Sequence, residues 1–289
     1  MTDLVFLGTG TMGLPMARNL LEAGFNVHAY NRTPDRARPL QDDGAQLYAD
    51  AAAAADGCPL MVTMLSDGDS VLEVATAALA ASTPPDVWIQ MSTIGVQDTE
   101  RCAELADDRE VTLVDAPVLG TRDPAQEGKL VILASGPESA RPAVDPVFEA
   151  VGARTEWLGE AGAATAAKVV INGWVVGVVG VLAEVITLAE GLGVDPQVFF
   201  DAVRGGPLDL PYAQLKGGAM IKHAFDDVSF RLALARKDTE LLLTAAGQAG
   251  LELPIMEGAL TRLRAAQDAG HGDEDMAATY WASAPDGAG

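Results

Sequence analysis

Residues 5–20 read VFLGTGTMGLPMARNL, a short apolar strand that runs into a glycine-rich turn and then into a helix. Gly8 permits the tight turn, Gly10 lets the backbone approach a pyrophosphate, and Gly13 allows the helix to pack closely on the strand. The N-terminus of that helix faces the phosphates in such sites. Three glycines at this spacing are weak evidence alone, but a second apolar strand over residues 27–30 ends where a dinucleotide site requires it. The stretch therefore predicts a dinucleotide-binding turn.

The end of the second strand predicts which dinucleotide is bound. An acidic residue there would accept from the 2′-hydroxyl of NAD, whereas this chain has the neutral Asn31. Arg32 can hold a phosphate with two parallel hydrogen bonds, and Thr33 adds a hydroxyl. Arg36 and Arg38 add positive charge nearby. The segment favours NADP(H) over NAD(H); the alternative is that these arginines only form a solvated face.

Composition excludes several classes of partner. The 289 residues include 19 basic and 41 acidic side chains, which gives a formal net charge of −22. Such a chain repels nucleic acids and anionic membranes, so we expect neither as a partner. The two cysteines and three histidines lack metal-ligand spacing, and no metal site is predicted. The start of the chain has no signal-peptide pattern, and we expect a cytoplasmic, reduced protein.

Apolar runs alternate with helical spacing up to about residue 160. The expected strands cover residues 60–65, 87–91, 111–114 and 130–134, and the expected helices cover residues 70–81 and 97–107. This alternation predicts an α/β fold with a doubly wound parallel sheet of the Rossmann type, whose ligand binds at the carboxyl ends of the strands.

The pattern changes after Trp157, and no further strand is predicted. A helix is expected from near residue 162 to residue 191, followed by another with Asp195 as N-cap and Pro196 at its first position. We therefore predict a dinucleotide-binding domain over residues 1–160 and an all-α domain for substrate binding and dimerisation over residues 161–289, connected by the long helix.

The long helix is unusually apolar between residues 169 and 183. A membrane span is the alternative, but the run is shorter than the about 20 residues that a bilayer requires. Lys168, Asn172 and Glu184 also lie in or beside it. A helix that is apolar all round belongs in the core of a larger assembly, which predicts a homodimer or homotetramer.

Lys168 and Asn172 are the candidate catalytic residues on this helix. Four residues apart, they share one face about a turn from the N-terminal end. An ammonium beside so much apolar surface suits a general acid that protonates a developing alkoxide. The alternative is a lysine whose charged end reaches water from a helix end.

The motifs together resemble those of the β-hydroxyacid dehydrogenase family. The similar segments are the glycine turn through Ala17, the loop Asp115-Ala116-Pro117-Val118 with Gly120, the stretch from Gly159 through Lys168 to Asn172, and the pair Lys237-Asp238. They occur in order from residue 4 to about residue 276. Within the family, residues 31–33 and 121–134 look most like the NADPH-dependent glyoxylate and succinic semialdehyde reductases.

The resemblance implies a role for each site residue. Lys168 would donate the proton, while Asn172 would position the lysine or the substrate carboxylate. The implied cofactor contacts are Gly8, Gly10, Thr11, Met12, Gly13, Asn31, Arg32, Thr33, Met64, Leu65, Thr93 and Lys237. The implied substrate contacts are Thr93, Leu119, Gly120, Thr121, Lys168, Asn172, Phe230 and Asp238.

One position departs from the family. Leu119 stands where these enzymes usually have serine, so a hydroxyl donor is missing and a bulkier or less polar substrate becomes possible. Arg122 could compensate as a cation. The expected activity is NADPH-dependent interconversion of a small aldehyde or keto acid and its hydroxy acid. The alternatives are a 3-hydroxyisobutyrate-type dehydrogenase, an imine reductase or reductive aminase, and a non-catalytic NADP-binding scaffold.

Overall fold

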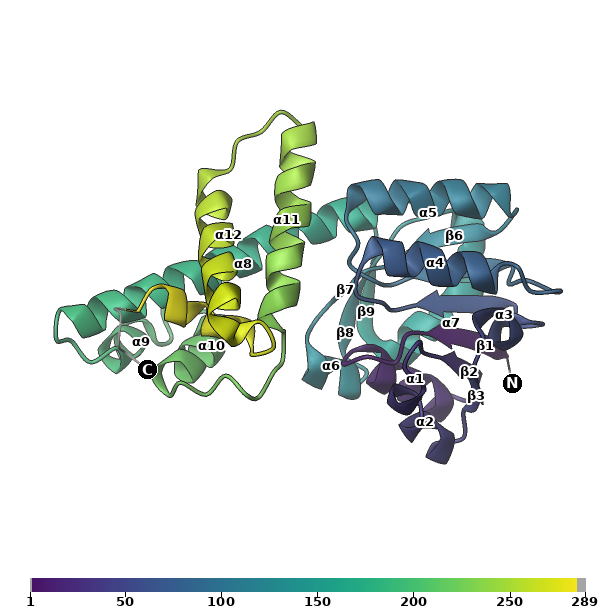
Figure 1. Cartoon of the computed structure of the whole chain (residues 1–289), viewed down its shortest axis with the longest axis horizontal. Helices are drawn as coiled ribbons and strands as arrows, with labels where there is room; N and C mark the ends of the chain where they lie inside the picture. The colour runs from purple at the N-terminus through teal and green to yellow at the C-terminus, as the bar shows by residue number, and fades with distance from the viewer. Residues whose placement is uncertain (1, 285–289) are drawn as a thin grey trace. The chain divides into compact units, whose positions relative to one another are not determined.

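The computed structural model describes residues 2–284 and divides into two compact units (Figure 1). The N-terminal unit comprises Met1–Lys168 and the C-terminal unit comprises Val169–Gly289. The boundary falls inside α8 (Ala163–Gly191), so the first turns of this helix belong to the N-terminal unit. The expected boundary at residue 160 lies just ahead of the helix.

A six-stranded parallel sheet forms the centre of the N-terminal unit. Its strand order is β3-β2-β1-β4-β5-β6. From β1 to β3 each new strand is added on one side, and from β4 to β6 on the other, so the order of addition reverses between β1 and β4. Ligands bind sheets of this kind at the carboxyl ends of the strands on either side of such a reversal. The strands are β1 (Asp3–Leu7), β2 (Asn26–Tyr30), β3 (Gln46–Tyr48), β4 (Leu60–Thr63), β5 (Val87–Gln90) and β6 (Thr112–Asp115).

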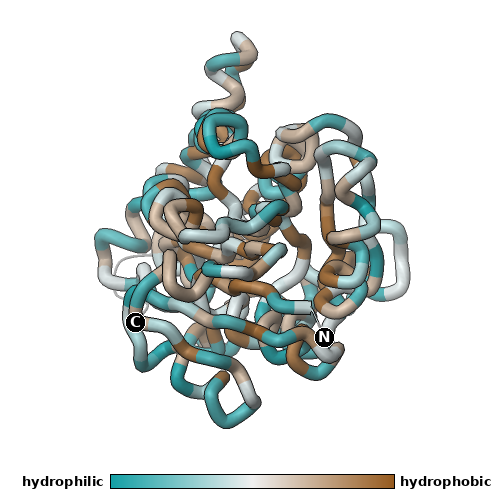
Figure 2. The backbone as a smooth tube through the Cα atoms, turned by 90° about the vertical axis from the view of Figure 1, so that its right-hand side faces the viewer, coloured by the Kyte–Doolittle hydropathy of each residue, from teal (hydrophilic) through white to brown (hydrophobic). Residues whose placement is uncertain are grey.

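Helices bury both faces of this sheet. On β1, alternate residues face opposite sides, with Leu4 and Phe6 in one core cluster and Val5 and Leu7 in the other. In Figure 2 the brown, hydrophobic stretches gather inside this unit, and the outer loops are mostly teal or pale. The helices are α1 (Gly13–Glu22), α2 (Pro39–Asp42), α3 (Ala51–Ala55), α4 (Gly68–Ala78), α5 (Val96–Asp108), α6 (Arg122–Gln126) and α7 (Arg141–Val151), with 3₁₀ turns η1 (Pro34–Arg36) and η2 (Glu138–Ala140).

A separate three-stranded sheet completes the N-terminal unit. β8 (Leu130–Ala134) is the strand predicted at these residues, but it lies in this sheet and not in the parallel one. It pairs antiparallel with β7 (Val118–Leu119) and parallel with β9 (Gly152–Trp157). Neither partner strand was predicted, because β7 has two residues and β9 is largely exposed.

The C-terminal unit is helical, and residues 169–284 contain no strand. α8 packs Val176, Val179 and Ile186 into a third core cluster. The next helix was expected to have Asp195 as N-cap, but it begins at Gln197 and its N-cap is Pro196, one residue later than predicted. The Asp195 carboxylate still accepts the Gln197 N–H at 2.9 Å. The elements that follow α8 are α9 (Gln197–Val203), α10 (Pro211–Ile221), α11 (Leu232–Gln248), α12 (Pro254–Ala266), η3 (Gln267–His271) and η4 (Met276–Ala282).

α8 is long and apolar enough to cross a membrane by length and composition, and 39% of its most apolar window is buried inside the protein. This is weak evidence for a span, because the core helix of a soluble protein passes the same test. Asn172 is buried on α8 and hydrogen-bonded within the C-terminal unit. α8 is therefore partly buried in the C-terminal unit, and part of its apolar surface is exposed.

Candidate active site

The glycine turn after β1 has the steric properties of a phosphate cradle. Gly8 has φ +106°, and a Cβ there would collide with the Met64 carbonyl. A Cβ on Gly13 would collide with the Gly8 carbonyl, whereas a Cβ on Gly10 would meet nothing within 4 Å. The turn is therefore closed at Gly8 and Gly13 and open at Gly10, where a pyrophosphate would approach.

The N-terminus of α1 can receive negative charge. Its N-cap Met12 makes no side-chain capping hydrogen bond, and its first turn contains no acidic residue. The Thr9 hydroxyl, in the same turn, is buried and has no hydrogen-bond partner within residues 2–284. The positive end of the helix dipole and an unsatisfied hydroxyl fit the phosphates of a dinucleotide.

Asn31 connects this turn to the end of β2. Its Oδ1 accepts the Thr9 N–H at 3.0 Å, and its Nδ2 donates to the Thr33 carbonyl at 2.9 Å. The Asn31 carboxamide therefore forms hydrogen bonds with the backbone of both Thr9 and Thr33. These contacts could not be predicted from the sequence.

The arginines near this turn fall into two groups. Arg18 pairs with Asp43 at 2.6 Å and Arg38 pairs with Asp35 at 2.9 Å. Arg32 is exposed and forms no ion pair with any residue that the structure describes. Its charge is therefore available to a ligand beside the end of β2.

A buried polar network fixes the carboxyl ends of β4 and β5. Ser92 Oγ accepts the Leu65 N–H at 2.9 Å, and the Ser92 N–H donates to Gln90 Oε1 at 2.7 Å. Gln90 Nε2 returns a 2.8 Å hydrogen bond to the Ser92 carbonyl. Met64 and Thr93, which are half-buried, lie next to these fixed groups. The parallel pairing of β1, β4 and β5 brings their carboxyl ends to the same edge of the sheet as the glycine turn.

The N-terminus of α8 is anchored by Asp115 at the end of β6. The Thr165 N–H and hydroxyl donate to the two carboxylate oxygens, each at 2.8 Å. Ser135 accepts the Ala164 N–H at 3.0 Å and donates to Asp115. Burial raises the pKa of Asp115, although hydrogen bonds from Thr165, Ser135 and Gly162 oppose the rise. Asp115, the first residue of the predicted loop motif Asp115–Val118, therefore caps the N-terminus of α8.

Lys168 lies one turn after this anchor. Its Nζ donates to the Val118 carbonyl at 2.8 Å. The Leu133 N–H donates to Pro117, so alternation along β7 directs the Val118 carbonyl away from β8, toward the open edge of the sheet. The anchored helix therefore holds an ammonium at a strand edge beside Leu119 and Gly120.

The loop after β7 offers backbone donors at that edge. Gly120 has φ +130°, and a Cβ there would be crowded by Leu130 and Pro124. The N–H groups of Gly120 and Thr121 form no hydrogen bond within the described chain. Leu119 is half-buried and faces Val131 across the strand pair. The edge can therefore bind an anionic or carbonyl oxygen even though the serine hydroxyl is missing.

The remaining predicted residues form a set in the C-terminal unit. Asn172 Nδ2 donates to Asp238 Oδ2 at 2.8 Å, and Lys237 Nζ lies 3.1 Å from Asp238 Oδ1. Phe230 is half-buried just ahead of α11, and its N–H donates to Asp275 at 3.1 Å. The structure thus brings Asn172, Lys237 and Asp238 together.

Several residues of these networks were missed by sequence reasoning, namely Gln90, Ser92, Ser135, Thr165 and Asp275, as was Lys216, which forms an ion pair with Asp275. Each is buried and polar, but none belongs to a motif that chemistry alone identifies.

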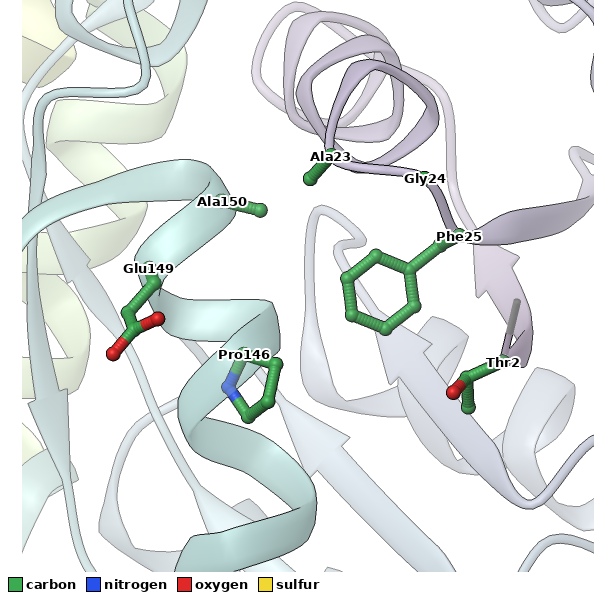
Figure 3. A pocket seen from close by; sticks show the side chains of 7 residues that line it. All are labelled: Thr2, Ala23, Gly24, Phe25, Pro146, Glu149 and Ala150. Atoms are coloured by element: carbon green, nitrogen blue, oxygen red, sulfur yellow. The ribbon is translucent and has the colours of Figure 1, made fainter.

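Two hollows lie outside these residues. One lies near the amino ends of β1 and β2, where the Phe25 ring is opposite Pro146 (Figure 3). This position is at the edge of the sheet opposite the glycine turn. The other, about 440 Å³, is apolar and is lined in the C-terminal unit by residues such as Trp174, Phe199 and Ile255. Neither contains the candidate catalytic residues.

Comparison with known proteins gives matches along nearly the whole chain. The family model described as the NAD binding domain of 6-phosphogluconate dehydrogenase matches residues 3–159. The model described as the NAD-binding domain of NADP-dependent 3-hydroxyisobutyrate dehydrogenase matches residues 162–282.

Individual relatives agree with these models. The chain is 32% identical to glyoxylate/succinic semialdehyde reductase 2 of Arabidopsis thaliana, over 94% of this chain and 77% of that protein. It is 32% identical to a probable 3-hydroxyisobutyrate dehydrogenase of Mycobacterium tuberculosis, over 96% of each chain. A solved 3-hydroxyisobutyrate dehydrogenase of Mycobacterium tuberculosis with L-serine superposes with a TM-score of 0.87 at 30% identity, covering 97% of this chain and 98% of that one. The matches to the family models and to these relatives are consistent with the glycine turn and with the lysine on α8. The chain belongs to the β-hydroxyacid dehydrogenase family of NAD(P)-dependent oxidoreductases.

Proposed function

We propose that this protein is an NADPH-dependent reductase of a small aldehyde or keto acid, working reversibly on the corresponding hydroxy acid. The observation that carries the proposal is the Lys168 ammonium, held at the open edge of β7 by a helix whose N-terminus is tied to Asp115. The relatives named as glyoxylate/succinic semialdehyde reductases support the substrate class.

Lys168 is proposed to donate a proton to the carbonyl oxygen as the oxygen gains negative charge. The free N–H groups of Gly120 and Thr121 would hold the substrate carboxylate beside it. Thr93 is a proposed contact of both substrate and cofactor. The proposed substrate contacts also include Leu119, Asn172, Phe230 and Asp238.

The N-terminal unit is proposed to hold the cofactor, whose chemistry is hydride transfer to the carbonyl carbon. Arg32 and Thr33 would bind the 2′-phosphate, and Asn31 would keep that loop in place through its two backbone hydrogen bonds. The proposed contacts with the rest of the dinucleotide are Gly8, Gly10, Thr11, Met12, Gly13, Met64, Leu65 and Lys237.

A 3-hydroxyisobutyrate-type dehydrogenase is the second candidate. Its support is a set of relatives at 32% identity with that name and one solved structure at 30% identity. Solved imine reductases and reductive aminases share the fold at 18–24% identity, which says nothing about their activity here. An ammonium at residue 168 argues against them, because it would repel a cationic iminium. The lysine also argues against a non-catalytic scaffold.

Loss of NADPH absorbance with a panel of substrates tests the proposal. The panel contains glyoxylate, succinic semialdehyde, methylmalonate semialdehyde and a cyclic imine, each with NADPH and with NADH. We expect turnover of an aldehyde acid, faster with NADPH. Turnover of the imine alone, or of nothing in the panel, would overturn the proposal.

We further propose that the second copy of this chain covers the apolar face of α8. Val170, Trp174, Val181 and Leu188 are 57–73% exposed on this helix, more large apolar surface than a soluble monomer usually leaves in one place. A symmetric dimer, or a dimer of dimers, would bury it. Residues 1–160 would then serve as the cofactor domain and residues 161–289 as the substrate and dimerisation domain of a cytoplasmic enzyme.

A further inference from the structure

A buried ion pair in the C-terminal unit joins Lys216 on α10 to Asp275. Lys216 Nζ lies 2.6 Å from Oδ1 and 2.8 Å from Oδ2 of the carboxylate. Lys216 is 2% exposed and Asp275 is 3% exposed. Burial raises the pKa of Asp275, but the charge and hydrogen bond of Lys216, with backbone donors, outweigh it and hold the pKa below its ordinary value. The Asp275 carboxylate is therefore ionised at neutral pH, although it is buried away from water.

Asp275 also gathers the segment that precedes α11. Its Oδ2 accepts the Ser229 N–H and the Ser229 hydroxyl, each at 3.0 Å, and the Phe230 N–H at 3.1 Å. Its Oδ1 accepts the Ala277 N–H at 3.0 Å. The next residue, Met276, donates its N–H to the Phe230 carbonyl at 2.8 Å. The backbone of Phe230 is thus held at both its donor and its acceptor.

The residues beside Asp275 cap α11. This helix has no side-chain cap at Arg231. Instead, the Leu232 N–H donates to the Glu274 carbonyl at 2.9 Å and the Ala233 N–H donates to the Gly272 carbonyl at 3.0 Å. The position of residues 272–276 therefore sets the position of the first turn of α11, which leads directly to Lys237 and Asp238.

Stability alone is a poor explanation for this ion pair. Replacing a buried ion pair by apolar side chains of similar size is often neutral or stabilising, because the desolvation of two charges is avoided. A charged pair with six directed hydrogen bonds has only one satisfactory geometry, whereas apolar packing tolerates small shifts.

We infer that the Lys216–Asp275 pair is a positioning device, which fixes Phe230 and the first turns of α11 so that Lys237 and Asp238 are presented in one orientation. This inference rests on the proposed function for the role of those three residues. Lys216 and Asp275 act through them and do not touch the substrate.

The test is the double variant Lys216→Met/Asp275→Leu, which removes both charges together. We expect a melting temperature close to that of the parent, and a kcat/KM for the preferred aldehyde acid lower by about 10- to 100-fold, the effect of a misplaced binding group. Amide hydrogen exchange should become faster in residues 225–238 and stay unchanged in the N-terminal unit. Arg204→Gln is the control, since it breaks the exposed Arg204–Asp201 pair on the same unit. It should change neither quantity.

Parent values of kcat/KM and exchange in the double variant would overturn the inference, as would faster exchange throughout the C-terminal unit with a lowered melting temperature. Should the double variant not fold, Ser229→Ala removes one donor to Asp275 and one acceptor of Lys216 and leaves the charges paired. We then expect a kcat/KM lower by about tenfold, the worth of two hydrogen bonds, and an unchanged value would contradict the inference. If the parent reduces no aldehyde acid, the proposed function fails, while hydrogen exchange in residues 225–238 still decides the positioning role.

Discussion

The Thr9 N–H donates to Asn31 Oδ1 at 3.0 Å, and this hydrogen bond ties the glycine turn to the end of β2. Since Asn31 Nδ2 is also bound to the Thr33 carbonyl, the carboxamide acts as a brace between two loops. In this position an aspartate could still accept from Thr9, but it would release Thr33 and repel a phosphate. The neutral Asn31 therefore holds both loops without adding negative charge, and Arg32 is the adjacent cation.

Arg32→Ala tests this assignment. We expect NADPH binding to weaken by roughly 1.5 to 3 kcal/mol, the worth of a charge-assisted contact, with little change for NADH. Arg38→Ala is a matched control, because Arg38 is already paired with Asp35. Cofactor titrations by fluorescence measure both. Equal losses for NADPH and NADH would contradict a 2′-phosphate contact at Arg32.

Gly10→Ala and Gly13→Ala should separate cofactor binding from folding. A methyl group at Gly10 meets no protein atom, so this variant should keep the parent melting temperature and lose affinity for both NADPH and NADH. A methyl group at Gly13 collides with the Gly8 carbonyl, so that variant should lose stability. Unchanged cofactor affinity in Gly10→Ala would mean that the phosphates bind elsewhere.

Much of the Rossmann sheet was predictable because β1, β4, β5 and β6 are almost wholly buried and read as apolar runs. The glycine turn was predictable because a backbone that approaches a phosphate closely requires glycine, which has no Cβ. The same requirement indicated the function of the turn. β7 and β9 were not, because a two-residue edge strand and an exposed strand leave no hydrophobic pattern.

The candidate site follows the same division. Lys168 and Asn172 could be paired from helical spacing, but the direction of each side chain depends on distant partners. Lys168 contacts Val118, fifty residues earlier, and Asn172 contacts Asp238, sixty-six residues later. The anchor between Asp115 and Thr165 likewise joins elements fifty residues apart. No local pattern encodes such contacts.

Asp115→Asn tests the anchor of α8. One amide oxygen cannot accept both Thr165 donors, so we expect a loss of about 1 to 3 kcal/mol in the free energy of unfolding. Burial raises the pKa of Asp115 in the folded protein, so as pH rises from about 3.8 the unfolded chain loses this proton first. The stability contributed by Asp115 therefore falls with rising pH across that window.

Urea denaturation of the parent and of Asp115→Asn between pH 4 and pH 8 measures the difference. The advantage of the parent should shrink as pH rises. An advantage that grows with pH would mean that the pKa of Asp115 is lowered by folding.

Trp174→Glu tests the proposed dimer. The side chain is 66% exposed on α8, and a carboxylate there would be buried without a partner in a symmetric interface. We expect light scattering at micromolar concentration to show a larger species for the parent and a monomer for the variant. Leu251→Glu is the control, because Leu251 is another exposed apolar residue but does not line the apolar hollow beside Trp174. A monomeric parent with intact turnover would show that α8 needs no partner chain.

Lys168→Ala tests the proposed proton donor. NADPH affinity should stay nearly unchanged, because the proposed phosphate contacts are the glycine turn and Arg32. Turnover of an aldehyde acid at saturating NADPH should fall by about 10² to 10⁴, the contribution of a positioned general acid. Lys237→Ala, measured beside it, distinguishes the two lysines, since Lys237 is paired with Asp238 and is proposed as a cofactor contact. If Lys168→Ala keeps full turnover and Lys237→Ala loses it, the proton comes from α11 and the role assigned to α8 is wrong.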